Sequence, residues 1–60
     1  MTEYEWIMVE QARAIWSEPH LSPDARIEKA IMRGAIRYRV QESFARRDRE
    51  LAEAIEGAAS

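Results

Sequence analysis

The fold is decided at residues 18–23, EPHLSP, where one helix ends and another begins. Pro19 pushes the residue before it out of the helical region, so a helix arriving from the N-terminal side ends near Ser17. Ser22 offers a side-chain oxygen at an N-cap position, and Pro23 suits the first helical position after it. We therefore expect two helices joined by a short turn, which makes them antiparallel neighbours.

A first helix is expected over about residues 3–17. Thr2 followed by Glu5 is a capping-box pattern, which marks its N-terminus. Most of its apolar residues share one broad face and the others lie outside it, so a single neighbouring helix cannot cover them all. The broad face holds Tyr4, Met8, Val9, Ala12, Ile15 and Trp16, and the apolar residues outside it are Trp6, Ile7 and Ala14. Trp16 is expected to pack within the hairpin, and Trp6 in an interface.

A second, longer helix is expected over about residues 23–56, with Gly57 as its C-terminal stop. At 1.5 Å per residue it is roughly 50 Å long, about twice the length of the first helix. The first helix therefore covers only its first half, up to about Tyr38. An alternative is a break between Gly34 and Arg39 that folds a third helix back onto the first two. We prefer the straight helix, because Gly34 is the only turn signal in this stretch.

The two halves of the second helix place their apolar residues on different sides. At 100° per residue, the first half has an apolar face and a basic stripe opposite it. The apolar face holds Ile27, Ile31, Ala35 and Tyr38, and the basic stripe consists of Arg26, Lys29, Arg33 and Arg37. In the second half a distal apolar stripe lies on the line that is basic upstream, and it consists of Val40, Phe44, Leu51 and Ile55. A lone helix that exposes such a stripe is unstable and prone to association.

The 60 residues make one small domain, over residues 1–60, and a chain of this size buries too little surface to be stable without reinforcement. Cysteine is absent from the sequence, which excludes disulfide bonds and thiolate zinc sites as that reinforcement. We therefore predict an all-α helical hairpin that self-associates into a homodimeric or higher-order helical bundle. The residues expected in the self-association interface are Trp6, Ile7, Val40, Phe44, Leu51 and Ile55.

Charge is distributed unevenly along the chain, although the net charge is only −2. Residues 1–25 carry a net charge of −4, residues 26–49 a net charge of +5 and residues 50–60 a net charge of −3. The most arginine-rich stretch, RYRVQESFARRDRE, has acids three or four residues from its arginines, a spacing that favours pairing on a helix surface. The expected pairs are Glu42–Arg46, Arg46–Glu50 and Arg49–Glu53. The basic stripe is therefore the better candidate for an anionic partner.

Catalytic, cofactor-binding and metal-binding residues are not predicted. His20 stands alone in the turn, and the sequence has no glycine-rich phosphate loop and no metal-ligand spacing. No apolar run approaches the roughly 20 residues that a membrane span needs. The first ten residues are acidic rather than basic, unlike a secretory signal. We expect a cytoplasmic, non-enzymatic protein without membrane association.

These patterns favour a small non-catalytic, homo-oligomeric interaction module that binds another protein and modulates it, as an adaptor, assembly factor or inhibitor. The residues expected to bind that partner are Trp6, Arg26, Lys29, Arg33 and Arg37. The alternative is a nucleic-acid-binding dimer that aligns two basic stripes, which the overall negative charge disfavours. A third hypothesis is an enzyme or ligand-binding oligomer with a site between subunits, for which the sequence provides no motif.

Overall fold

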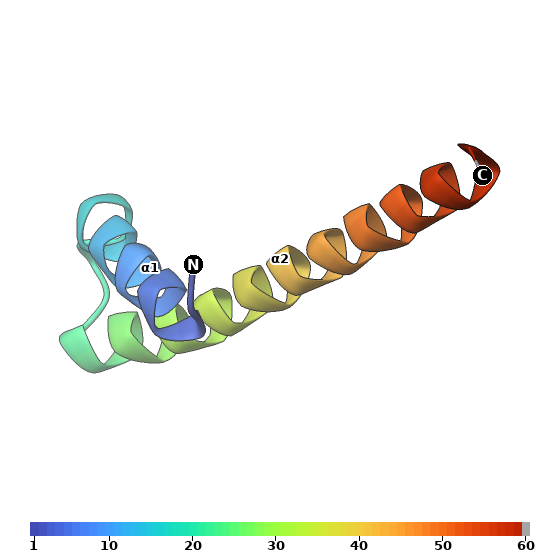
Figure 1. The fold of residues 1–60 in the computed structure, drawn as a ribbon. Helices are drawn as coiled ribbons and strands as arrows, with labels where there is room; N and C mark the ends of the chain where they lie inside the picture. The colour runs from blue at the N-terminus through green and yellow to red at the C-terminus, as the bar shows by residue number, and fades with distance from the viewer. Residues whose placement is uncertain (60) are drawn as a thin grey trace.

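The computed structural model of the chain describes residues 1–59 and shows a helical hairpin (Figure 1). Helix α1 spans Glu3–Ser17 and helix α2 spans Pro23–Ala59, and residues 18–22 connect them. The two helices run antiparallel, and the described part of the chain contains no strand. The predicted hairpin, the bounds of the first helix and the start of the second are confirmed.

Side-chain caps fix both helix starts. The Thr2 hydroxyl accepts a hydrogen bond from the backbone N–H of Glu5 at 3.2 Å, and the Glu5 carboxylate accepts one from the N–H of Thr2 at 2.9 Å. This reciprocal pair is the predicted capping box. The Ser22 hydroxyl accepts from the N–H of Ala25 at 3.2 Å, so the N-cap role predicted for Ser22 is confirmed.

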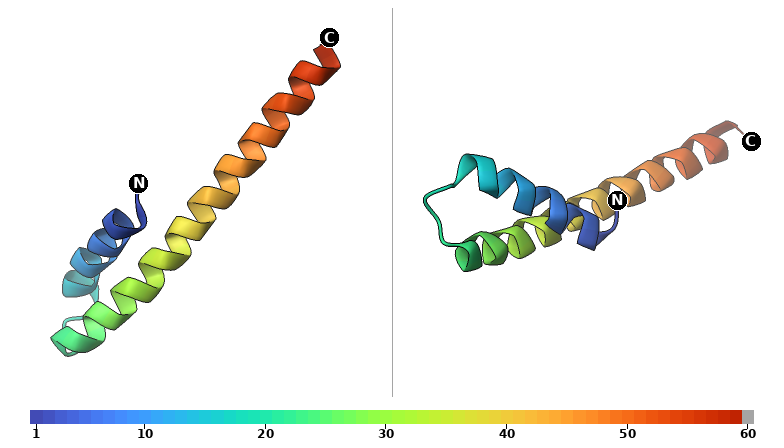
Figure 2. Two further views of the ribbon diagram at one scale, coloured as in Figure 1. Left: turned by 60° about the horizontal axis from the view of Figure 1, so that its bottom comes forward. Right: turned by 90° about the vertical axis from the view of Figure 1, so that its left-hand side faces the viewer.

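Helix α2 is continuous, so the alternative fold with a break between Gly34 and Arg39 is not formed. Figure 2 shows it as a single rod from two further directions. The prediction that it stops before Gly57 is wrong, because it runs on to Ala59. Gly57 does not adopt the positive φ angle that a glycine stop requires, and it therefore continues the helix.

The two helices touch through small residues. Ala14 of α1 and Ala30 of α2 are buried, and Gly34 is buried near them. A Cβ atom at Gly34 would lie 2.5 Å from Cγ1 of Ile7 and 2.6 Å from its Cα, so only glycine permits this approach. The spacing of Ala30 and Gly34, four residues apart, therefore allows the two backbones to pack closely.

The rotation of both helices differs from the prediction. The broad apolar face of α1 points to solvent, where Trp16 is 87% exposed and Tyr4 is 70% exposed. On α2, the predicted core residues Ile27 and Ile31 are exposed as well. Both assignments are wrong because the helices are oriented by close contacts of alanine and glycine and by charge pairs, and not by their largest apolar side chains.

The hairpin occupies one end of an elongated molecule with principal dimensions of 57 × 15 × 12 Å. Its Cα radius of gyration is 16.9 Å, whereas a compact domain of this length has about 10 Å. Every residue from 42 to 59 is exposed. Helix α2 therefore extends past α1 as an uncovered rod, as the predicted difference in helix length implies.

Candidate interaction surfaces

The basic stripe of α2 lies toward α1 and the connection. Arg33 donates from Nη1 and Nη2 to the two carboxylate oxygens of Glu18, at 3.1 and 3.0 Å. Nζ of Lys29 lies 3.8 Å from the same carboxylate. The predicted position of these side chains opposite the hairpin interface is wrong, because the carboxylate at the end of α1 attracts them inward.

A second carboxylate, that of Glu10, lies inside the hairpin. Glu10 is only 3% exposed, and its Oε1 forms an ion pair with Arg37. Nη1 of Arg13 lies 3.8 Å from the same oxygen. Oε1 accepts no hydrogen bond of regular geometry within residues 1–59, so the nearby guanidinium groups are what compensates its charge. Arg26, the remaining member of the basic stripe, pairs with no carboxylate in the described residues.

Two carboxyl groups titrate below their ordinary range. The hydrogen bonds from Arg33 hold the pKa of the Glu18 carboxyl below its usual value of 4.5. The pKa of the Glu5 carboxyl is lowered by hydrogen bonds with Thr2, and the largest contribution comes from the Thr2 backbone N–H. In each case the partner favours the charged form, so the ion pair and the helix cap are both present at neutral pH.

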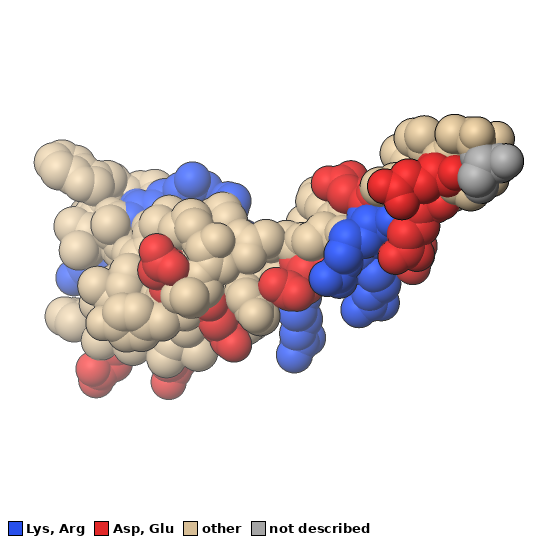
Figure 3. Space-filling view, viewed as in Figure 1, with Lys and Arg blue, Asp and Glu red and all other residues tan. Residues whose placement is uncertain are grey.

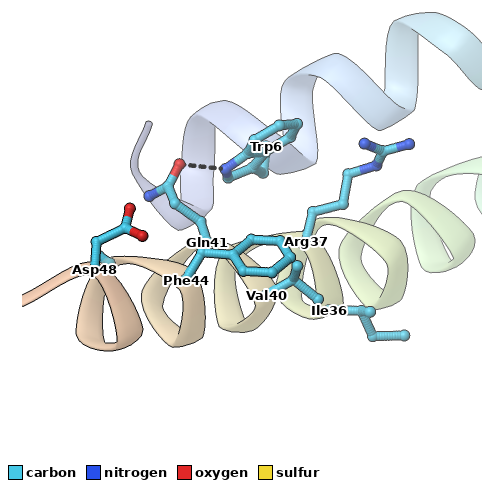
Figure 4. A pocket seen from close by; sticks show the side chains of 8 residues that line it. Trp6, Ile36, Arg37, Val40, Gln41, Phe44 and Asp48 are labelled. Carbon is cyan, nitrogen blue, oxygen red and sulfur yellow. Dashed lines mark hydrogen bonds between the residues drawn. The ribbon is translucent and has the colours of Figure 1, made fainter. Parts of the chain in front are cut away.

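Trp6 lies where α1 passes over α2. Its Nε1 donates to Oε1 of Gln41 at 3.0 Å, and Cζ of Arg37 lies 5.4 Å from the ring centroid, within cation–π range (Figure 4). Gln41 also donates from Nε2 to the carbonyl of Met1 at 2.6 Å. Trp6 is therefore partly used within the hairpin, whereas Trp16, which was predicted to pack there, is exposed.

An open groove of about 630 Å³ lies beside Trp6, and we call it the Trp6 groove (Figure 4). Its apolar surface comes from the indole ring and from four side chains of α2, and its polar groups are an amide, a guanidinium group and the carboxylate of Asp48. The lining residues that matter here are Trp6, Ile36, Arg37, Val40, Gln41 and Phe44. The groove is thus apolar inside and polar along one edge, as protein-binding grooves commonly are.

The distal stripe begins in this groove and continues toward the C-terminal end of α2. All four of its side chains are exposed, including Phe44 at 56% and Ile55 at 62%. The stripe lies on the same line of α2 as the basic stripe, because successive steps of seven or four residues turn a helix by only about 20–40°. Residues on this line are Arg26, Arg33, Arg37, Phe44, Leu51 and Ile55. This line therefore carries arginines that pair with Glu10 and Glu18 upstream, and it stays uncovered downstream.

The charged residues of the distal half are solvated and unpaired with one another. Within residues 1–59, none of the predicted pairs Glu42–Arg46, Arg46–Glu50 and Arg49–Glu53 closes to 4.0 Å. Figure 3 shows acidic and basic side chains interleaved along this part of the molecule. The predicted pairing is wrong, because these long exposed side chains gain little by holding one geometry.

Several hairpin residues were not predicted from the sequence. Ile7, Glu10 and Ala14 lie three and four residues apart, a spacing that marks one helix face, but the glutamate conceals this face in a search for apolar residues. Ile7, predicted for self-association, is half-buried against Gly34 inside the hairpin. Gln41 had no signal in the sequence, since its role depends on Trp6 lying above it.

The described residues provide neither a membrane-spanning segment nor a cluster of metal ligands. Neither helix, over the residues described, has a segment of sufficient length and apolar character to cross a bilayer. The same residues contain no group of three or more His, Cys, Asp or Glu side chains placed to hold a metal ion.

Comparison with protein-family models, with curated proteins and with solved structures finds no match for this chain. A function must therefore follow from the molecule's own surfaces. Three of these surfaces are candidate interaction sites: the apolar distal stripe, the Trp6 groove and the exposed aromatic face of α1.

Proposed function

We propose that the chain is a small non-catalytic module that self-associates and also binds another protein, which it modulates. The observation that carries the proposal is the exposed distal stripe on the uncovered half of α2. Contiguous apolar patches are uncommon on soluble monomers and mark interaction sites. Burying one large apolar side chain contributes about 1.5–3 kcal/mol, so covering four of them per chain is a strong drive to associate.

The outer face of α1 supports binding of a second protein. This face is on a different helix from the distal stripe and includes the exposed side chains of Tyr4, Ile15 and Trp16. Trp and Tyr are the residues most enriched at energetically dominant positions of interfaces. We assign partner binding to this face in place of Trp6 and the basic stripe, because Trp6, Lys29, Arg33 and Arg37 are engaged within the hairpin.

Nucleic-acid binding through the basic stripe has less support. Arg33 and Lys29 contact the Glu18 carboxylate, and Arg37 pairs with Glu10, so phosphates would have to displace these acids. Binding of this kind weakens steeply with added salt. A mobility-shift titration at low and moderate salt tests it, and a chain that shifts no DNA or RNA at low salt eliminates this function.

Self-association is tested by the mass of the full chain in solution. Multi-angle light scattering at several concentrations is expected to give at least twice the chain mass of 7.0 kDa. Leu51→Gln and Phe44→Gln each remove two apolar side chains per dimer, so each is expected to raise the dissociation constant at least about 100-fold. Both changes keep a residue that favours the helix.

Glu53→Gln is the matched control, since it introduces the same residue on the exposed half of α2 outside the distal stripe. It is expected to keep the wild-type mass. A wild-type chain that stays at 7.0 kDa at every concentration would remove the proposal. So would a Leu51→Gln chain that associates as tightly as the control.

Partner binding is tested with Trp16→Ala. A photoreactive residue at position 12, an exposed position on the same face of α1, captures neighbouring proteins in cells, and each captured protein is then purified and titrated directly. The proposal expects binding to the wild-type chain and at least tenfold weaker binding to Trp16→Ala, with the solution mass of Trp16→Ala unchanged. Equal binding by both chains would move the partner site away from α1.

A further inference from the structure

We propose that the Trp6 groove is occupied by the C-terminal end of α2 from a second copy, residues 47–59, in an antiparallel two-fold dimer. This proposal rests on the proposed self-association and specifies its geometry. Each chain would place its own C-terminal end in the groove of the other, so both grooves and both distal stripes are covered at once. Isologous two-fold pairing is the commonest symmetry among homo-oligomers.

The spacing of the distal stripe is symmetric. Val40 and Ile55 lie equally far from the midpoint between residues 47 and 48, and so do Phe44 and Leu51. Antiparallel pairing about that midpoint sets Val40 opposite Ile55 of the second copy and Phe44 opposite its Leu51. All the large side chains of the stripe then meet apolar partners.

The groove has the position along α2 that this pairing needs. Its residues on α2 lie between 36 and 48, and in this register they face residues 47–59 of the second copy. The incoming helix runs antiparallel to α2, as α1 does, and its C-terminal end lies beside Trp6. Its last turns carry Ala54 and Ala58, small residues that permit close approach where three helices meet.

The charge distribution favours antiparallel over parallel pairing. Residues 50–59 carry a net charge of −3, whereas residues 36–45, which they face in this register, carry a net charge of +1. The antiparallel arrangement therefore brings the acidic end of each α2 beside a weakly basic segment of the other. A parallel arrangement would set acidic end against acidic end and basic half against basic half, which complementary interfaces avoid.

The exposed area has the size of one side of an interface. The chain exposes 4853 Å², whereas a globular monomer of its mass exposes about 4,000 Å². The excess is about 800 Å², which is what one partner buries in an interface of standard size. A second copy is therefore a sufficient occupant for the uncovered half of α2.

Pairing direction is tested by a distance between identical labels. The sequence contains no cysteine, so Glu28→Cys places one spin label per full-length chain, on an exposed position of α2 outside the groove. Antiparallel pairing about the midpoint of residues 47 and 48 separates the two labelled positions by about 60 Å at 1.5 Å per residue. Parallel pairing keeps them within about 30 Å, because packed helices lie about 10 Å apart.

The outcomes separate this inference from the proposed function. A distance near 60 Å in a chain that scatters as a dimer supports the antiparallel arrangement. A dimer with labels within 30 Å overturns it and leaves self-association intact. A chain that remains a monomer at every concentration overturns both.

Groove occupancy is tested through the emission of Trp6. In Trp16→Phe, Trp6 is the only tryptophan, and its emission is expected to shift to shorter wavelength as the dimer forms. Ile55→Gln is expected to abolish the shift, whereas Glu53→Gln keeps it. A dimer that forms without any change in Trp6 emission would show that the second copy does not enter the groove.

Discussion

The first half of α2 is packed against α1, whereas the second half is exposed to solvent. The first half is held against α1 by Ala30, by Gly34 and by arginines that pair with acids. The second half is exposed throughout, although it carries the large side chains of Phe44 and Leu51. The chain thus holds its hairpin together by close fit and charge, and leaves its apolar stripe available for association.

From this division we expect a single hairpin to be only weakly stable. The buried hydrophobic residues are alanines, and the described part of the chain has no large side chain that is fully buried. Folding therefore gains little from apolar burial inside one chain, and we expect folding to be coupled to assembly. Stability measurements on this protein have to be compared at one fixed concentration.

Gly34→Ala is the substitution expected to disrupt the contact between the first half of α2 and α1 most strongly while leaving the second half of α2 unchanged. The new methyl group would collide with the backbone of Ile7, so we expect the free energy of unfolding to fall by about 3 kcal/mol, at the upper end of overpacking effects. Urea denaturation monitored by circular dichroism measures the change.

The matched control is Gly57→Ala, where an added Cβ meets nothing within 4 Å. The same substitution is expected to have the opposite sign there and to raise stability by up to about 1 kcal/mol, because alanine favours the helix. If both variants were stabilised, the close contact of α1 with α2 would be disproved.

The fold was largely predictable from the sequence, and the orientation of its faces was not. The turn, both N-caps and the continuous α2 follow from local rules that involve few residues, such as Ser22 before Pro23. The packing faces depend on which pairs meet across the hairpin. An apolar count favours Trp16 and Ile27, but the close approach at Gly34 and the pull of the acids turn both helices the other way.

The candidate surfaces were predictable to a similar extent. The distal stripe could be predicted from the regular spacing of apolar residues along one helix, and its exposure follows from the difference in helix length. The Trp6 groove was not visible, because it is formed between Trp6 of α1 and residues such as Phe44 of α2. Sites built from two elements require the rotation of each element, which one sequence does not specify.

A smaller effect is expected from the ion pair inside the hairpin. Arg37→Ala removes the main charge partner of the buried Glu10 carboxylate, so we expect a loss of about 2 kcal/mol in urea denaturation. This is less than for a fully buried pair, because Arg37 is partly exposed.

Two comparisons check the reason for this loss. Replacing both partners, as Glu10→Leu with Arg37→Leu, is expected to recover most of the stability, since no buried charge is then left unpaired. On the exposed half, Arg46→Ala is expected to change stability by less than about 0.5 kcal/mol. An equal loss for Arg37→Ala and Arg46→Ala would contradict the division between the two halves of α2.

The smallest effect, and the one that reports most directly on the end of the hairpin, is the response to acid. Because Arg33 keeps the pKa of Glu18 below 4.5 in the folded chain, this pair stabilises the fold above that pH. Its contribution is lost as the pH falls through the lower, folded-state pKa. Urea denaturation at about pH 7 and about pH 3 should therefore show a drop in stability that is smaller in Glu18→Gln than in the wild type. Glu53→Gln makes the same change of charge on the exposed half of α2, and a reduction as large as that of Glu18→Gln would assign the acid response to net charge instead of to this pair.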